Sequence, residues 1–352
     1  MTPAGPSRSA RHPAGRRTPT SVRGPGELVA AVPVLLGFHP ARSLVVVSTH
    51  GPGLRTVGVT LRADLPGPPG CATAAEVDEL CAMVARSLVE AAGAGPVGAA
   101  VVVVDAAVDG GPAPGVAALA DAAAAALLAA GVGVVGTQVW AAATTAGAAW
   151  ACTAPCGCAG TVADPEALPL TAAAVVAGAV VRASRAELVA ALEAPDPDDL
   201  RRRSALFDRE LELRAACRDE ASRAAALESA LDATACGTLV LDDATVLDLA
   251  LALQTPQVRD VALRACVGPR AAVAEQLWAA LVRETPEPES AEAAVLLAVA
   301  ALGRGDGALA NVAVDRARRA WPGHGLAEAL AEALGNGFGP AQVRAWLADG
   351  PA

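Results

Sequence analysis

Alternating and continuous hydrophobic stretches in the first half of the chain predict strands. Arg55–Asp64 places Val57, Val59 and Leu61 on one face and small or polar residues on the other, which is typical of a half-buried strand. Ser43–Thr49 is a more apolar strand, and the Gly- and Pro-rich turn between the two favours an antiparallel hairpin.

A longer apolar run, Ala99–Val104, is typical of a central strand that is covered on both faces. Helical periodicity predicts helices around it, and a second hairpin follows. Together these elements predict an α/β domain, a mixed sheet flanked by helices, over residues 26–160. The other predicted elements are helices at 26–37, Ala74–Ala92 and Val116–Ala130, and strands at Val132–Ala141 and Ala146–Thr153.

From residue 200 onward every segment follows helical periodicity, which predicts an all-α domain over residues 200–352. Residues 161–199 supply connecting helices and a linker, and Ser184 with Glu187 has the spacing of a capping box. The connecting helices are Pro169–Gly178 and Ser184–Glu193. The later helices are Leu200–Leu231, Asp243–Gln254, Pro256–Val267, Ala271–Arg283, Ser290–Leu302, Ala308–Ala320, Leu326–Leu334 and Pro340–Leu347.

The last four predicted helices resemble helical-hairpin repeats of the tetratricopeptide type. Leu309, Val312, Ala313 and Ala317 follow the i, i+3, i+4 pattern after a Gly-rich turn. Helix pairs of this kind bury one face only by stacking on neighbours, and they often form protein-binding surfaces. The same pattern also fits the core of an ordinary helical domain.

Charge is distributed unevenly along the chain. Lys and Tyr are absent, and five of the 27 Arg residues lie in the first 26 residues, where there is no acid. The rest carries 22 Arg against all 37 acidic residues. An acidic body excludes a duplex-binding surface, which needs clustered cations.

The tail at residues 1–25, rich in Arg and Pro, is predicted to be disordered. It is either an arm that touches RNA or lipid, or a dispensable extension.

Two features resemble a dinucleotide-binding site and a membrane span, but the residues around them argue against both. The glycines at 131, 133 and 136 match the dinucleotide-binding pattern, but a predicted helix precedes them and a strand follows, the reverse of what that site needs. Ala122–Ala163 has no charged residue, yet Gly and Thr interrupt it, so buried strands and an Ala-rich helix explain it better than a membrane span. Without an export signal, we expect a cytoplasmic protein with reduced thiols.

Three of the eight cysteines lie close together in the sequence, at Cys152, Cys156 and Cys158. Zinc prefers four tetrahedral ligands, usually from two spaced pairs, and here there is a single cluster. The cluster is therefore a zinc site completed through the fold, a redox pair, or a Gly/Pro turn with incidental thiols. No other metal or cofactor is predicted.

Four polar residues near predicted strand ends are candidates for chemistry. His39 lies between a helix and a strand, where it can act as acid, base or ligand, or cap the helix. Arg62 and Asp64 are two apart on one strand face, so they can pair or bracket a polar ligand. Asp105 follows the apolar strand, at the end where α/β sheets bind ligands and where acids also cap turns.

Several long motifs resemble the family called domain of unknown function 4192. They are the run AVPVLLGFHP at 31–40 with Ser43–Val45, LRADLP at 61–66, SRAELV at 184–189, VRDVAL at 258–263 and GDGALANVA at 305–313. In the family's usual pattern two adjacent Cys precede a Pro, whereas here Gly157 separates Cys156 from Cys158. The resemblance implies a cytoplasmic actinobacterial protein with no assigned activity, and it supplies no catalytic residues.

Two functions are compatible with these observations. The first is a non-enzymatic binding or scaffolding protein, with a protein partner on the C-terminal helices, because no complete catalytic constellation is present. The second is an enzyme, a hydrolase or a phosphoryl-handling protein, with His39, Arg62, Asp64 and Asp105 around one mouth of the sheet. The second requires these four side chains to converge on one pocket.

Overall fold

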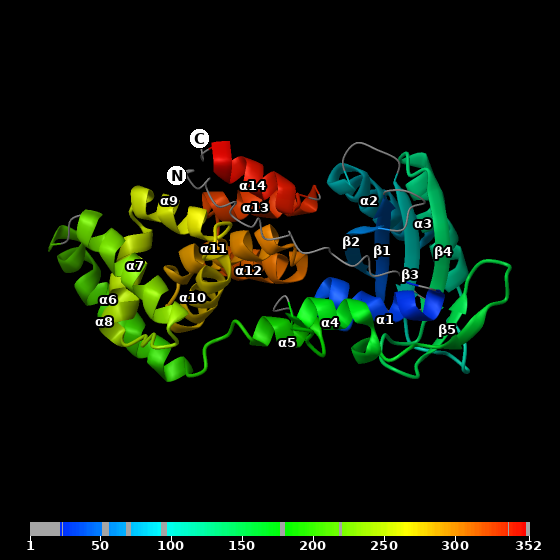
Figure 1. The fold of residues 1–352 in the computed structure, drawn as a ribbon, viewed down its shortest axis with the longest axis horizontal. Coiled ribbons are helices and arrows are strands. Elements are labelled where there is room, and N and C mark those ends of the chain that lie inside the picture. The colour runs from blue at the N-terminus through cyan, green and yellow to red at the C-terminus, as the bar shows by residue number, and fades with distance from the viewer. Residues whose placement is uncertain are drawn as a thin grey trace, which may run out of the picture.

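The computed structural model of the chain describes residues 22, 24–50, 56–67, 72–92, 97–176, 180–217, 220–336 and 338–349. The fold is mixed α/β. A six-stranded mixed sheet is built from the first half, and helices make up the second (Figure 1). Nearly all of the predicted tail lies outside the described residues, and the division into separate domains stays a prediction.

The sheet has the strand order β2-β1-β3-β4-β5-β6, so β2 and β6 are its edges. β1 pairs antiparallel with both β2 and β3, and β3 pairs parallel with β4 through the crossover helix α3. Both predicted hairpins and the central strand are confirmed. The strands are β1 Ser43–His50, β2 Thr56–Asp64, β3 Gly98–Val104, β4 Val134–Ala141, β5 Ala149–Cys152 and β6 Ala159–Thr161.

A β-bulge interrupts the alternation of β2. Val47 pairs with Thr60 but Thr49 pairs with Val57, so β2 carries one extra residue there. Gly58 fits at the bulge because a Cβ would lie 2.6 Å from the Ser48 hydroxyl. The prediction that Val57, Val59 and Leu61 share one face is therefore wrong: Val57 and Leu61 pack against different hydrophobic clusters on the two faces of the sheet.

Helices cover both faces of the sheet. α2 (Ala74–Ala92) and α3 (Val116–Ala129) bury one face, together with Leu44, Val46 and Val101. α1 (Pro25–Leu36) covers the other face and ends at Gly37, which takes the left-handed conformation that favours glycine at a helix end. The bounds of α2 are those that its amphipathic pattern predicts.

The elements that follow β6 are all helices, and α11 lies at their centre. Every residue of α11 from Ser290 to Leu302 is buried, and α8, α9, α10, α12, α13 and α14 all contact it. One hydrophobic cluster joins this core to Val45 and Val102 on the α1 face of the sheet. The later helices are α4 Pro169–Val176, α5 Arg185–Ala190, α6 Pro197–Cys217, α7 Glu220–Ala235, α8 Asp243–Leu253, α9 Pro256–Ala265, α10 Ala271–Glu284, α11 Ser290–Arg304, α12 Gly307–Ala320, α13 Gly325–Gly335 and α14 Pro340–Asp349.

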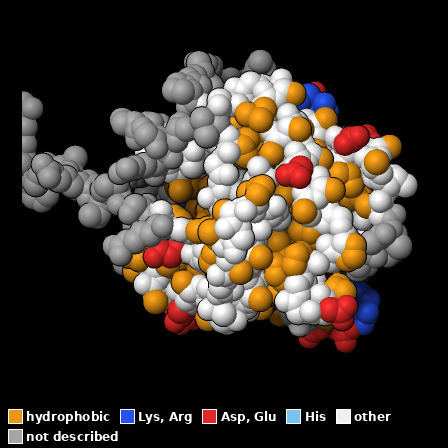
Figure 2. All heavy atoms as spheres, turned by 90° about the vertical axis from the view of Figure 1, so that its right-hand side faces the viewer, with side chains coloured by type: hydrophobic (Ala, Val, Ile, Leu, Met, Phe, Trp, Pro, Cys, Tyr) orange, Lys and Arg blue, Asp and Glu red, His pale blue; other side chains and the backbone are white. Residues whose placement is uncertain are grey.

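The side of the molecule formed by the sheet and α3 has few charged side chains in view (Figure 2). Hydrophobic side chains are interspersed there with other atoms. Leu128 of α3 is one of the exposed large hydrophobic residues. Scattered hydrophobic residues are normal on a monomer and do not mark a binding site. None of the described helices is long and apolar enough to span a membrane.

The helical core depends on Trp278 of α10, which is fully buried in the shared cluster. We expect Trp278→Ala to lower the free energy of unfolding by about 3–5 kcal/mol, because the cavity adds to the lost burial. Trp321→Ala is the matched control, since this ring is 43% exposed, and it should cost at most about 1 kcal/mol. Urea unfolding followed by circular dichroism measures both, and equal losses would contradict this description of the core.

Candidate functional site

A cleft of about 930 Å³ lies between the β2 edge of the sheet and the last helices of the chain. β2 and α2 form one side, and the end of α1 closes another. The opposite wall comes from α12, α13 and the residues around Phe338, far along the sequence (Figure 1). At the rim, the Ser87 hydroxyl of α2 donates a hydrogen bond of 2.9 Å to the Gly335 carbonyl at the end of α13, which ties the two walls together.

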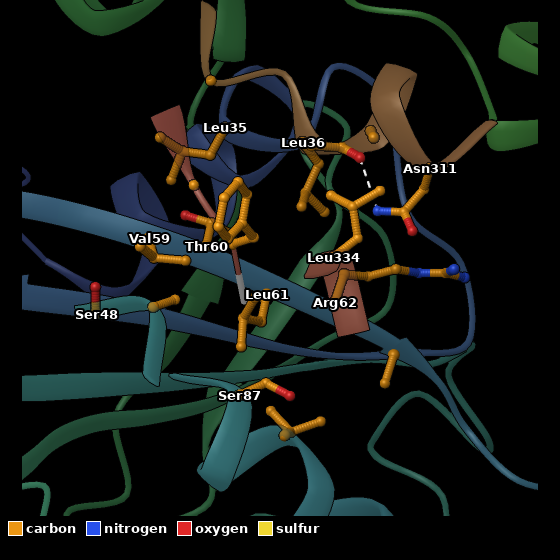
Figure 3. Close-up of a pocket in the computed structure, with 18 of the residues that line it drawn as sticks. Leu35, Leu36, Ser48, Val59, Thr60, Leu61, Arg62, Ser87, Asn311 and Leu334 are labelled. Carbon is orange, nitrogen blue, oxygen red and sulfur yellow. Dashed lines mark hydrogen bonds between the residues drawn. The ribbon is translucent and has the colours of Figure 1, made fainter. Parts of the chain in front are cut away.

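The cleft runs along the free edge of β2 and, beside Gly58, also reaches Ser48 and His50 of the neighbouring strand β1. All seven residues from Gly58 to Asp64 line it, although successive side chains of a strand point to opposite faces. Figure 3 shows Val59, Thr60, Leu61 and Arg62 following one another along the strand, with Leu35 and Leu36 on one side and Ser87 on the other.

The register identifies which main-chain groups of β2 are free. The Leu65 amide donates to the Arg42 carbonyl at 2.9 Å, which makes these two residues a hydrogen-bonded pair. Since such pairs alternate along an antiparallel ladder, Leu61 and Ala63 turn their main-chain groups toward β1, and Thr60 and Arg62 turn theirs away from it. Among the described residues, no hydrogen bond joins this free edge to another element.

Arg62 forms the polar end of the cleft. Its guanidinium donates to both carboxylate oxygens of Asp64 and to the Ser43 hydroxyl, the latter at 2.8 Å, and its Cζ lies 5.8 Å from the centre of the Phe38 ring. The prediction that Arg62 and Asp64 can pair is confirmed. Arg62 is therefore fixed in position, while Asp64 stays mostly exposed to solvent.

His39 and Asp105 do not join this group. The ring nitrogen Nδ1 of His39 is hydrogen-bonded to the Thr144 hydroxyl at 2.9 Å, and burial lowers the pKa of the imidazole. Asp105 accepts a hydrogen bond from the Ala106 amide at 3.0 Å and lies 3.9 Å from Arg42. Neither residue lines the cleft, so of the four predicted candidates only Arg62 and Asp64 face it.

The three clustered cysteines come together at the opposite edge of the sheet. Cys152 ends β5, and Cys156 and Cys158 lie in the turn to β6, an edge strand that the sequence analysis missed. Their sulfur atoms all lie within 4.8 Å of one another, so the three could hold a metal ion, and no fourth ligand joins them among the described residues. Burial raises the pKa of Cys152 to about 11, whereas a hydrogen bond from the Cys158 main chain lowers that of Cys156.

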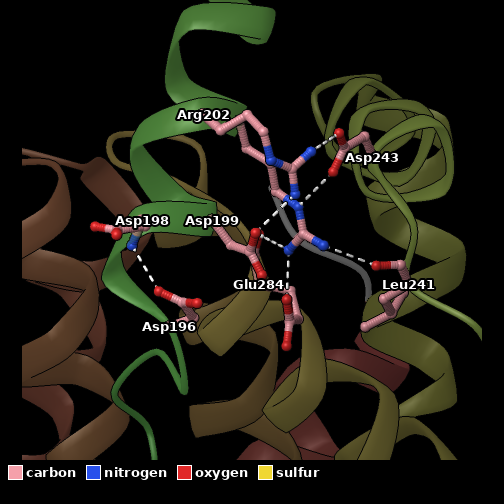
Figure 4. Close-up of polar contacts among 8 residues, drawn as sticks. Asp196, Asp198, Asp199, Arg202, Leu241, Asp243 and Glu284 are labelled. Carbon is pink, nitrogen blue, oxygen red and sulfur yellow. Dashed lines mark hydrogen bonds and ion pairs between the residues drawn. The ribbon is translucent and has the colours of Figure 1, made fainter.

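A separate polar cluster joins α6 to α8 and α10 (Figure 4). Arg203, only 5% exposed, donates to Asp243 at 3.0 Å, to the Leu241 carbonyl at 2.9 Å and to both the carboxylate and the main-chain carbonyl of Glu284. Arg202 also pairs with Asp243. Because these donors already have partners within the protein, the cluster is a structural tie and not a binding site.

The cleft itself could not be found from local patterns, because its two walls are more than 200 residues apart in the sequence. One signal was present: segments that carry the family resemblance meet here. Leu36 and Phe38 belong to the first motif, Arg62 and Asp64 to the second, and Asn311 to the last.

The fold and the cleft together define a mixed α/β protein with a helical second half and one large cleft described between them. The chain belongs to the family DUF4192, described as a domain of unknown function, whose model matches residues 25–341. No curated protein and no solved structure shows significant similarity to the chain.

Since Arg203 is buried among acidic partners, we expect Arg203→Ala to lower the free energy of unfolding by about 2–4 kcal/mol, as breaking a buried ion pair does. Arg201→Ala removes a neighbouring, exposed pair with Asp198 and should change stability little. Thermal unfolding of the two variants measures the difference. A melting temperature for Arg203→Ala equal to that of Arg201→Ala would show that the cluster is not a structural tie.

Proposed function

We propose that this protein is a non-enzymatic binding protein whose cleft takes up an extended segment of a partner polypeptide. The segment would pair with the free edge of β2 as an added strand, a known mode of peptide recognition. The observation that carries the proposal is the free main-chain edge at Thr60 and Arg62, which faces a cleft of about 930 Å³.

The size of the cleft suits a short peptide in extended conformation. Seven residues of β2 line it, and at about 3.3 Å per residue they span about 20 Å, so a partner segment of about six residues would fill the edge. Main-chain hydrogen bonds would supply affinity without regard to sequence, and alternate side chains of the peptide would give specificity.

The walls favour apolar side chains on the peptide. Leu35 and Leu36 at the end of α1 line the cleft, and so do Leu334 of α13 and Phe338. Figure 3 shows Leu35, Leu36 and Leu334 near the strand residues. Because Arg62 is already paired with Asp64, and the chain carries a net charge of −10, an acidic segment is disfavoured. The proposed partner segment is therefore apolar, with neutral or basic residues on either side.

The helices near the end of the chain, which the sequence predicts to form helical hairpins, are part of the proposed binding site. α11 and α12 pack against each other as an antiparallel pair, and α12 and α13 line the cleft. These helices would act as a rigid wall, which is how helical-repeat proteins present a binding surface. A cytoplasmic location also stays an inference, supported by six free cysteines among the described residues.

The enzymatic alternative has less support. It needs His39, Arg62, Asp64 and Asp105 around one pocket, and only two of them face the cleft. Each of the four is also bonded to a neighbour within the protein. Ser48 and His50 both line the cleft beside Gly58, but no hydrogen bond joins them, so they do not form the activated nucleophile–base pair of a hydrolase in this structure.

Selection of random peptides displayed on phage, with the full-length chain as the target, tests the proposal. Enriched peptides should bind the wild-type chain at least about tenfold more tightly than Leu334→Glu, which places a charge in the apolar wall. Leu128→Glu, on the exposed surface of α3, should bind like wild type. N-methylation of the peptide at alternate residues should abolish binding in one register and not in the other.

Three outcomes would contradict the proposal. The first is equal binding by Leu334→Glu and wild type. The second is an N-methylation effect that is the same in both registers, because it would show that main-chain pairing plays no part. The third is much tighter peptide binding by a chain without residues 1–21, which would assign the cleft to the chain's own tail.

A further inference from the structure

The turn between β5 and β6 holds three thiols in a fixed arrangement. The Cys152 amide donates to the Cys158 carbonyl at 2.7 Å, which closes the turn, and Gly157 adopts a positive φ of 65° between the other two cysteines. This backbone brings all three sulfur atoms within 4.8 Å of one another. The main-chain hydrogen bond that closes the turn explains why residues 152 and 158 lie close together.

We propose that Cys152, Cys156 and Cys158 bind one zinc ion through three thiolates, with a fourth position open to solvent. Sulfur ligands at about 2.3 Å from zinc lie about 3.8 Å apart in a tetrahedron. The sulfur atoms need only small side-chain rotations to reach that spacing. Cys156 and Cys158 are exposed, so the remaining position is accessible to water or to a ligand from another molecule.

The chemistry of the ligand set favours zinc over hard cations. Thiolates are soft ligands, and Ca²⁺ and Mg²⁺ prefer oxygen atoms, of which this turn offers no carboxylate. Binding converts three thiols into three thiolates and releases three protons, without any oxidation or reduction. The site therefore needs no co-reactant, and zinc binding should weaken as the pH falls.

The zinc site is separate from the cleft. β6 and β2 are the two opposite edges of the sheet, with four strands between them. Zinc binding therefore does not depend on the proposed peptide binding, and an experiment can contradict one without contradicting the other. The other exposed cysteine described, Cys236, lies beyond the end of α7 and outside the cluster, so it supplies a matched control.

Zinc titration of the full-length protein tests the site. The protein is reduced, stripped with a chelator and titrated with Zn²⁺ in competition with a chromophoric zinc indicator. One equivalent should bind to wild type and to Cys236→Ser, and binding should be lost in the Cys156→Ser/Cys158→Ser double variant. Co²⁺ in place of Zn²⁺ should give the intense thiolate-to-metal absorption of a sulfur-rich tetrahedral site, and only in the first two proteins.

Because both substituted cysteines are exposed, the double variant should keep the circular dichroism spectrum of wild type. Failure of the reduced wild-type protein to bind zinc would overturn the proposal. So would equal binding by the folded double variant and wild type, since the ion would then lie elsewhere. Loss of binding in Cys236→Ser would overturn it as well, because that residue is outside the cluster.

Discussion

α11 is buried on all sides by six other helices, and their packing around it holds the two halves of the molecule together. Apart from Ser290 and Glu292, the buried stretch of α11 is hydrophobic, so it must be covered on all sides, and each buried Leu or Val contributes about 1.5–3 kcal/mol. The surrounding helices supply that cover. The same hydrophobic cluster reaches Val45 and Val102 under α1, so the helical half is held against the sheet by one continuous core. The cleft exists because this core fixes α12 and α13 opposite β2.

An edge strand is usually protected against pairing with other chains by charges, by proline or by a covering helix. In this protein helices flank β2 on both faces of the sheet, and α12 and α13 stand across from its edge. Among the described residues, no other element forms a hydrogen bond with the free main-chain groups of β2. Under the proposed function, this arrangement would admit one extended segment along the edge of β2 and would leave no room for a second sheet to pair with it.

Much of the fold follows from the sequence because its signals are local. The acidic first turn and the apolar face of α2 determine its limits, and the Gly and Asp residues before α12 determine where that helix begins. The pairing of Arg62 with Asp64 is also local, since residues two apart on a strand share a face.

The bulge at Gly58 was not predictable, because alternation looks the same with one extra residue. β6 has only three residues, Ala159–Thr161, and no strong strand former before its last position. The cleft is formed by packing across the whole chain, which no local pattern encodes.

Strand addition at β2 can be measured by hydrogen exchange at single amides, with and without a selected peptide. The amides of Thr60 and Arg62 should become protected when the peptide binds, because they point to the free edge and gain acceptors from the added strand. The amides of Leu61 and Ala63, which already face β1, should change little. Protection confined to α12 and α13, with exchange at Thr60 and Arg62 unchanged, would show that the peptide does not pair with β2.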